Sequence, residues 1–297
     1  MRTSDQLTKD LNMFVAVLFL PVVAGNLFME SSLHSFPKIT ERSGYVKTYM
    51  IFDPCNMNKP GNRTVSCAQL KMEGNNETGD YFISPYTNFS VRCDMDTNGG
   101  GWTVIQRRSW DELEGNGFEK SEKDYEEGFR GGASSYWIGL TNIHALTSHP
   151  NSDQVLRIEL TTLKDETIIV QYGKFKVGPK KDGYRLTVGD YTSPNGTDYD
   201  GLAFHDQTTF SVAKKTDRVD PCSGSLKTGG WWFPPFGCSF SNLNGRKLKG
   251  DVPKNNMGFG ITWYKTGDFD SYENGYKSVE MKVRDVNFEL CMGRIST

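Results

Sequence analysis

Histidine is scarce in this 297-residue chain, which limits the chemistry open to it. The chain has only four histidines, and none lies in an HExxH motif or at a Cys/His spacing that binds zinc. Residues 211–214 match the pattern SxxK, but the companion motifs of that enzyme class are missing from the chain. With no nucleophile and base pair and no metal motif, the sequence predicts a protein that is not an enzyme.

The chain also lacks an excess of charge of one sign. Its 34 Lys and Arg residues against 36 Asp and Glu give a formal net charge of -2, with an isoelectric point of about 6.1. No electrostatic excess draws such a chain to nucleic acid or to an anionic membrane. The compact basic cluster Arg246–Lys249 is therefore expected to be a solvated turn, and nucleic acid is excluded as a partner.

Apolar runs long enough to cross a membrane are missing too. The stretch Met13–Ala24 is too short to span the ~30 Å hydrocarbon core of a bilayer and is typical of the apolar part of a signal peptide. Acidic residues accompany the basic ones before it, so a translation start at Met13 is one alternative, and a buried strand or short helix is another. The sequence predicts a signal peptide over residues 1–25, secretion, and no insertion into the membrane.

The cysteines and glycosylation motifs agree with secretion. An even number of six cysteines after a signal peptide predicts up to three disulfides. These cysteines are Cys55, Cys67, Cys93, Cys222, Cys238 and Cys291. Asn-x-Ser/Thr motifs predict N-glycosylation at Asn62, Asn76, Asn88 and Asn195.

Heptads and Gly-X-Y repeats are absent, and the composition indicates one domain. Residues 26–63 are polar and proline-bearing, which is typical of a linker. Alternating apolar residues predict strands of one antiparallel sheet at 102–108, 154–160, 167–175 and 278–284, with short helices at 124–129 and 142–146. Residues 204–275 have almost no periodicity and predict a long, ordered, loop-dominated region. The run Gly99–Gly101 predicts a tight turn that allows Trp102 to pack.

The segment 91–108, VRCDMDTNGGGWTVIQRR, resembles the signature of the fibrinogen C-terminal domain. Further similar segments follow in the order of that family: YEEGF at 125–129, YWIGL at 136–140, IHALT at 143–147, GWWF at 230–233, SNLNG at 241–245 and EMKVR at 280–284. The family includes ficolins, tachylectin-like lectins, angiopoietins and fibrinogen chains. The resemblance implies an α+β fold with a central twisted antiparallel sheet, short helices and a loop-rich C-terminal subdomain, and it leaves the function open among these branches.

Domain boundaries follow from the resemblance. The fibrinogen C-terminal domain is expected over residues 64–288, followed by a tail over 289–297. Within the domain we expect an N-terminal subdomain at 64–108, a central sheet at 109–204 with 277–286, and a loop-rich ligand subdomain at 205–276.

The resemblance also implies disulfide pairs that spacing alone leaves open. It implies that Cys67 pairs with Cys93, and Cys222 with Cys238. The two remaining cysteines, Cys55 and Cys291, lie outside the pattern of the family. They either pair with each other or link two chains in a disulfide-bonded dimer.

Members of the family usually hold calcium with an Asp-x-Asp pair before the third of these core cysteines, since the ion takes six to eight oxygen ligands. This chain has a shorter segment there, with Asp217 and Asp220 separated by two residues and with basic neighbours. The expectation is therefore weak or absent calcium binding, the alternative being an ordinary polar turn. No other cofactor is expected.

Lectin-like members bind acetylated sugars in an aromatic pocket beside the second disulfide. The histidine and a tyrosine of that pocket fall here on Ser239 and Met257. A different polar set is therefore expected, unless the asparagines only fix a turn and the aromatic residues belong to the core. The candidate ligand residues are Trp231, Ser239, Asn242, Asn244, Met257 and Phe259.

The leading hypothesis for function is a secreted recognition module that binds extracellular ligands, namely glycans or acetylated groups in innate defence. The alternative is a protein-binding adhesion, matrix or receptor-ligand module without sugar binding. The expected partners are therefore an extracellular glycan or glycoprotein, or a protein receptor.

Overall fold

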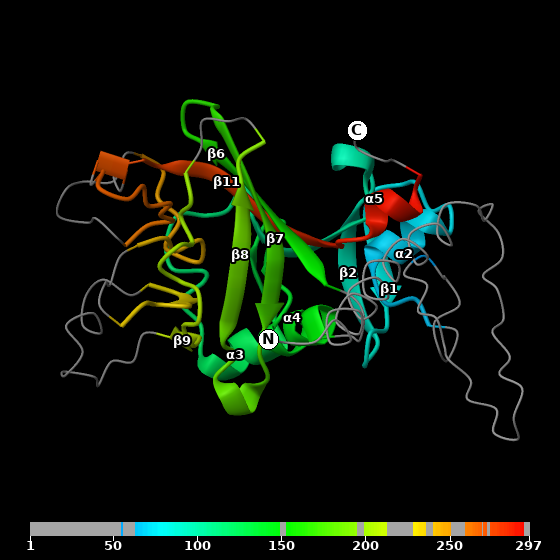
Figure 1. The fold of residues 1–297 in the computed structure, drawn as a ribbon. Helices are drawn as coiled ribbons and strands as arrows, with labels where there is room; N and C mark the ends of the chain where they lie inside the picture. The colour runs from blue at the N-terminus through cyan, green and yellow to red at the C-terminus, as the bar shows by residue number, and fades with distance from the viewer. Residues whose placement is uncertain are drawn as a thin grey trace, which may run out of the picture. The chain divides into compact units, whose positions relative to one another are not determined.

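Residues 53–297 contain an antiparallel sheet (Figure 1), in whose strands successive side chains point to opposite faces. The structure is a computed structural model that describes residue 55 and residues 63–148, 153–194, 199–212, 228–235, 240–250, 259–268, 270–271 and 274–293. The signal peptide and nearly all of the linker that the sequence predicts lie outside the described residues.

The sheet has nine strands, and neighbouring strands run in the order β1-β2-β3-β11-β6-β7-β8, with β5 pairing to both β3 and β4. The strands are β1 (Gly79–Ile83), β2 (Phe89–Asp94), β3 (Trp102–Arg108), β4 (Phe129–Gly132), β5 (Ser135–Trp137), β6 (Gln154–Thr162), β7 (Thr167–Val177), β8 (Leu186–Thr192) and β11 (Tyr276–Asp285). A separate short ribbon joins β9 (Ser211–Val212) to β10 (Gly230–Trp231). The helices are α2 (Cys67–Met72), α3 (Glu122–Glu127), α4 (Leu140–Ser148) and α5 (Phe288–Cys291), with 3-10 turns at η1 (Thr97–Gly99) and η2 (Lys180–Asp182).

The four strands predicted from alternation are confirmed as β3, β6, β7 and β11. The last strand, β11, lies between β3 and β6, so the C-terminal segment completes the middle of the sheet. On one face of β11, Met281 and Val283 lie opposite the buried residues Ile158 and Leu156 of β6. Because side chains alternate along a strand, Glu280, Lys282 and Arg284 occupy the other face.

The boundaries of the two predicted helices needed correction. Helix α3 begins two residues earlier than predicted, because Ser121 caps it: the Asp124 backbone N–H donates to Ser121 Oγ at 3.2 Å, and the Ser121 N–H donates to Asp124 Oδ2 at 3.0 Å. It ends at Gly128, whose φ of 94° interrupts the helix. Helix α4 extends the prediction at both ends and contacts β7.

The predicted tight turn before Trp102 is confirmed. Gly100 has a φ of 78°, and a Cβ there would lie 2.1 Å from the Met95 carbonyl oxygen, so a side chain has no room. The Trp102 indole N–H donates to the Thr97 carbonyl at 2.9 Å. Arg284 of β11 closes the turn from the other side, with its guanidinium 4.1 Å above the Trp102 ring and a hydrogen bond of 2.9 Å to the Gly100 carbonyl.

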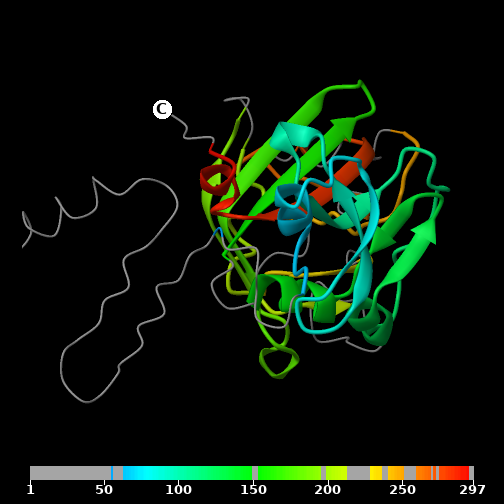
Figure 2. The ribbon, with the colours of Figure 1, turned by 90° about the vertical axis from the view of Figure 1, so that its right-hand side faces the viewer.

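Two disulfides anchor α2 and α5, each through a cysteine of the helix. Cys67 pairs with Cys93 at a Cα–Cα distance of 5.5 Å, as the resemblance implies, and Cys55 pairs with Cys291 at 5.1 Å. The structure thus takes the intrachain alternative for Cys55 and Cys291, which leaves neither sulfur free to link two chains. Figure 2 looks from the side on which α2 and α5 lie.

The structure adds detail to the predicted boundaries, which stay predictions. Residues 289–291 of the predicted tail are helical and belong to α5, whose first residue, Phe288, is buried. The predicted N-terminal subdomain at 64–108 contributes β1, β2 and β3 to the common sheet, and β3 is an inner strand of it. The loop-dominated character predicted for 204–275 is confirmed in its described parts, where the strands are only β9 and β10.

Candidate functional site

The loop-rich region is anchored by a buried histidine. His205 Nε2 accepts a hydrogen bond from the Ser241 backbone N–H at 3.1 Å, so the ring proton is on Nδ1, which lies 2.7 Å from the Trp232 carbonyl oxygen and donates to it. Burial lowers the pKa of His205 to about 4, and the bond to Trp232 only partly offsets this effect. His205 is therefore a neutral structural link between two loops.

Three of the predicted ligand residues are buried. Trp231 and Asn244 are fully buried, and Asn242 is 2% exposed. The Asn242 side-chain amide donates to the Thr228 carbonyl at 2.8 Å, and the Asn244 amide donates to the Gly230 carbonyl at 2.9 Å. Ligand contact by Trp231, Asn242 and Asn244 stays a prediction, and their burial favours the alternative. In that alternative the two asparagines fix the backbone of the loops, as their hydrogen bonds do here.

Aromatic residues at the border of this region are not sealed in the core. Phe240 is half-buried and stacks on half-buried Phe204, with ring centroids 4.6 Å apart and planes 22° from parallel. The Tyr264 ring also packs against Phe240, with ring centroids 5.1 Å apart. Phe240 directly follows the candidate residue Ser239, which lies outside the described residues, as does Met257. Phe259 is half-buried too, with the Arg246 guanidinium 5.5 Å from its ring centroid.

The structure leaves the calcium prediction untouched, because Asp217 and Asp220 lie outside the described residues. The same is true of Cys222 and Cys238. Within the described ranges, no group of three or more His, Cys, Asp and Glu side chains is arranged to hold a metal ion.

One basic residue near this region contradicts the predicted solvated turn at 246–249. Lys247 is only 3% exposed, and its ammonium donates to the backbone carbonyls of Tyr276 and Lys277. Burial is the main cause that lowers the pKa of Lys247 to about 8, while Glu112 opposes that shift. This lysine joins the loop-rich region to the start of β11, a long-range contact that no local sequence pattern indicates.

Of the four predicted glycosylation sites, Asn76 and Asn88 are exposed. The Asn76 side-chain oxygen accepts a hydrogen bond from Lys71 Nζ at 2.8 Å. Asn62 and Asn195 lie outside the described residues. Glycosylation stays a prediction at all four positions.

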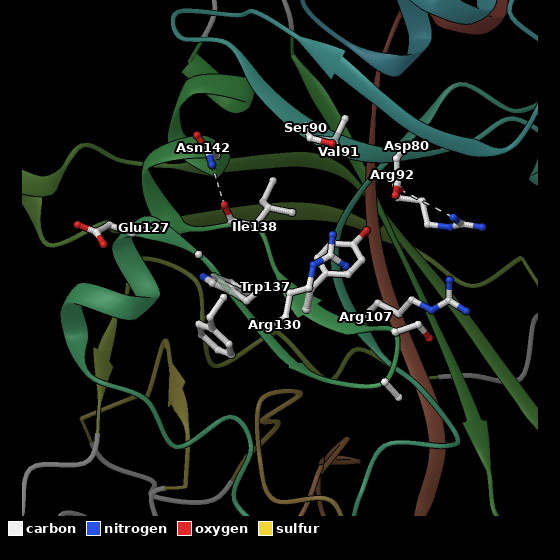
Figure 3. A pocket seen from close by; sticks show the side chains of 15 residues that line it. Asp80, Ser90, Val91, Arg92, Arg107, Glu127, Arg130, Trp137, Ile138 and Asn142 are labelled. Carbon is white, nitrogen blue, oxygen red and sulfur yellow. Dashed lines mark hydrogen bonds and ion pairs between the residues drawn. The ribbon is translucent and has the colours of Figure 1, made fainter.

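A pocket that sequence analysis missed opens between two β-hairpins (Figure 3). We call it the fork pocket; its volume is about 480 Å³, within the range of small-molecule sites. One wall comes from β1 and β2, and the opposite wall from the end of α3 and from β4 and β5. Its lining residues are Asp80, Ser90, Val91, Arg92, Arg107, Glu127, Gly128, Phe129, Arg130, Ala133, Ser134, Tyr136, Trp137, Ile138 and Asn142.

Comparison with known proteins decides the family. Residues 63–286 match the family model of the fibrinogen beta and gamma chains, C-terminal globular domain. The chain belongs to this family. Its fibrinogen C-terminal domain is similar to mouse (Mus musculus) fibrinogen-like protein 1, with 35% identity over 237 residues, which are 75% of this chain and 72% of the relative. It is also similar to chicken (Gallus gallus) tenascin-R, with 36% identity over 237 residues, 77% of this chain and 16% of the relative.

Solved structures agree with the fold. The fibrinogen-like globe domain of human ANGPTL6 matches with a TM-score of 0.63 and 30% identity, over 77% of this chain and 99% of that domain. This confirms the predicted fold: a fibrinogen-like globe with a central antiparallel sheet and a few short helices. Fibrinogen C domain-containing protein 1 of Xenopus tropicalis is 34% identical over 233 residues, and the match spans 75% of this chain and about half (48%) of that relative.

The family consists of extracellular ligand-binding modules that are not enzymes, and the relatives are secreted or extracellular fibrinogen-like proteins. Among the helices of the described ranges, none is long and apolar enough to cross a membrane.

Proposed function

We propose that this chain is a secreted, non-enzymatic recognition module that binds glycans or acetylated groups on extracellular glycoproteins, in a role in innate defence. The binding surface would be the border of the loop-rich region around Phe204 and Phe240. The observation that carries the proposal is the half-buried stacking of these two rings, the second of which directly follows Ser239 in the sequence. Rigid aromatic rings that keep an exposed edge provide apolar contact area for a sugar ring or an acetyl methyl group.

The buried residues around these rings support the same proposal. His205, Trp232 and Asn244 have their polar groups engaged in holding the loops. The Trp231 indole N–H, in contrast, has no acceptor among the described residues. A surface whose loops are fixed in advance loses less conformational entropy when a ligand binds.

The test is an array of neutral, acetylated and acidic glycans, probed with the secreted protein with and without EDTA. We expect saturable binding to acetylated glycans, and we expect Phe240→Ala to weaken it about tenfold, which corresponds to about 1.4 kcal/mol. The matched control is Phe82→Ala, because Phe82 lies on β1 and is 71% exposed. Absence of saturable glycan binding by the wild-type protein, or equal affinity of the Phe240→Ala variant, would refute the proposal.

Protein recognition is the second candidate, and one surface feature favours it. In the loop after β3, Trp110 is 72% exposed and Leu113 is 81% exposed. Exposed tryptophans are frequent anchors of protein interfaces. Under this alternative, the array gives no glycan binding, and saturable binding to an extracellular matrix extract is lost in Trp110→Ser and kept in Phe240→Ala.

A further inference from the structure

The fork pocket exists because two hairpins share one edge of β3. Strand β2 pairs with the first half of that edge, placing Arg92 opposite Val104. Strand β5 pairs with the second half, placing Tyr136 opposite Arg107. Because β2 and β5 use the same edge in succession, the β1–β2 and β4–β5 hairpins must diverge, and the pocket lies in the space between them. Figure 3 shows Arg92 and Asp80 on one hairpin and Arg130 and Trp137 on the other.

Strand register brings arginines from three strands to this opening. Arg107 of β3 lies opposite Tyr136 of β5, and Tyr136 lies opposite Arg130 of β4. The three side chains thus form one cross-strand row, with the Arg130 guanidinium 5.8 Å from the Tyr136 ring centroid. Arg92 of β2 adds a third guanidinium from the facing hairpin.

The hydrogen-bonding capacity of these guanidiniums is largely unused. Arg92 reaches Asp80 only at 3.9 Å and Arg107 reaches Glu280 only at 3.8 Å, both beyond hydrogen-bonding distance. Arg130 has no ion pair among the described residues. In contrast, Arg108, buried nearby, donates to Glu112 at 2.9 Å and 2.7 Å.

The carboxylates around the pocket leave room for a bound anion. Asp80 and Glu280 lie beside Arg92 and Arg107, and Glu127 lines the opposite wall. Neither the Arg92–Asp80 pair nor the Arg107–Glu280 pair is within hydrogen-bonding distance. An incoming oxyanion can therefore accept hydrogen bonds from these guanidinium N–H groups without first breaking an existing hydrogen bond. Guanidinium forks match the planar geometry of a carboxylate and also bind sulfate.

We propose that the fork pocket binds an acidic saccharide, with its carboxylate or sulfate held by Arg107 and Arg130 and its ring beside Tyr136. Sugar hydroxyls both donate and accept hydrogen bonds. The pocket offers them matching groups: the hydroxyls of Ser90 and Ser134, and the side-chain oxygen of Asn142. An acidic peptide is the competing ligand. Polar surface exceeds apolar surface in the lining, and the three guanidiniums lie beside serine hydroxyls, which favours a polyhydroxylated acidic ligand.

The experiment uses titration calorimetry on the full secreted chain with defined probes. Tetragalacturonate supplies carboxylates, a sulfated neocarratetraose supplies sulfates, neutral galactotetraose supplies neither, and hexaglutamate represents an acidic peptide. None of these saccharides carries an acetyl group, so the surface around Phe240 is not tested by them. We expect one or both acidic saccharides to bind, and which one does identifies the acid group. Galactotetraose and hexaglutamate should bind at least about tenfold more weakly than the acidic saccharide.

The variants are Arg130→Gln and Arg107→Gln, and the control is Lys176→Gln, which removes the same charge from an exposed position on β7. Loss of one charge-assisted contact should weaken binding about tenfold or more in both arginine variants and leave the control unchanged. Arg130 is exposed, so its variant should keep the wild-type melting temperature and report on binding alone.

Two outcomes overturn the inference: equal affinity of the arginine variants and the control, or binding of hexaglutamate in place of both saccharides. Two variants distinguish failure of this inference from failure of the proposed function. Phe240→Ala should leave tetragalacturonate binding intact, and Arg130→Gln should leave acetylated-glycan binding intact.

Discussion

Replacing Lys282 by methionine should destabilise the domain more than any change to a surface ion pair. The Lys282 side chain is 1% exposed, and its ammonium lies 2.8 Å from Asp94, 3.1 Å from Glu159 and 3.2 Å from Glu280. Methionine preserves the volume of the side chain but leaves three carboxylates facing one another. Removing one partner of a buried ion pair costs about 3–5 kcal/mol, because the remaining charges stay buried without compensation.

The pKa values of the cluster set the pH dependence. Burial opposes ionisation of Asp94, but hydrogen bonds from Lys282 and Thr97 outweigh it and lower the pKa of Asp94 well below its ordinary value. A carboxyl with a lowered folded-state pKa contributes stability that is present above its unfolded pKa and is lost as the pH falls through the folded one. In Lys282→Met, Asp94 loses the hydrogen bond that lowers its pKa, and the three carboxylates repel one another, so that variant should gain stability relative to wild type as the pH falls from 7 to 5.

Thermal and urea unfolding, followed by circular dichroism under oxidising conditions, measure the effect. For a domain of this size, a loss of 3–5 kcal/mol lowers the melting temperature by about 6–20 °C. The control is Lys123→Met, because Lys123 and Glu127 form an exposed pair whose loss should cost under about 1 kcal/mol. Should Lys282→Met not fold, folding of Lys282→Arg, which keeps the charge, would show that loss of the charge is the cause, and failure of both variants would contradict the reasoning. A loss equal to that of the control, or one that is the same at pH 7 and pH 5, would refute the reasoning.

Three further predictions concern other regions. Burial holds the pKa of Lys247 near 8, below its unfolded value, so wild-type stability should rise between about pH 8 and 10 relative to Lys247→Met; parallel stability curves over this range would contradict the buried ammonium. Non-reducing peptide mapping should recover Cys55 linked to Cys291 in one chain, and a disulfide-linked dimer on a non-reducing gel would contradict the pairing. Calcium at 1 mM should change the melting temperature little, and a clear increase that is lost in Asp217→Asn/Asp220→Asn would show that the shortened segment binds the ion.

The part of the fold that sequence predicted is the part set by local periodicity. Alternation over the lengths of β6, β7 and β11 makes these strands visible, because one face of each is buried. Strands β4 and β5 have only four and three residues, too few to show a period. The fork pocket depends on their pairing with β3, which is a long-range contact, so no local pattern could reveal the pocket.

The candidate ligand residues were harder to predict for a chemical reason. An asparagine in a loop can bind a ligand or satisfy the backbone, and its identity does not distinguish these roles. Asn242 and Asn244 satisfy the backbone here. Lys247 was misjudged in the opposite sense: a basic cluster predicts solvent exposure, yet the Lys247 side chain is buried and donates to two carbonyl groups at the start of β11, which offset part of the cost of burial.

Hydrogen exchange with and without a glycan identified on the array tests the central claim, recognition through the loop-rich region, most directly. The account predicts that ligand slows exchange in the loops around Phe204 and Phe240, while exchange in β6 and β7 is unchanged because backbone hydrogen bonds already protect these strands. Phe240→Ala should reduce this protection at the same ligand concentration. Protection confined to the strands of the sheet, or no change in the loop-rich region at saturating ligand, would contradict the account.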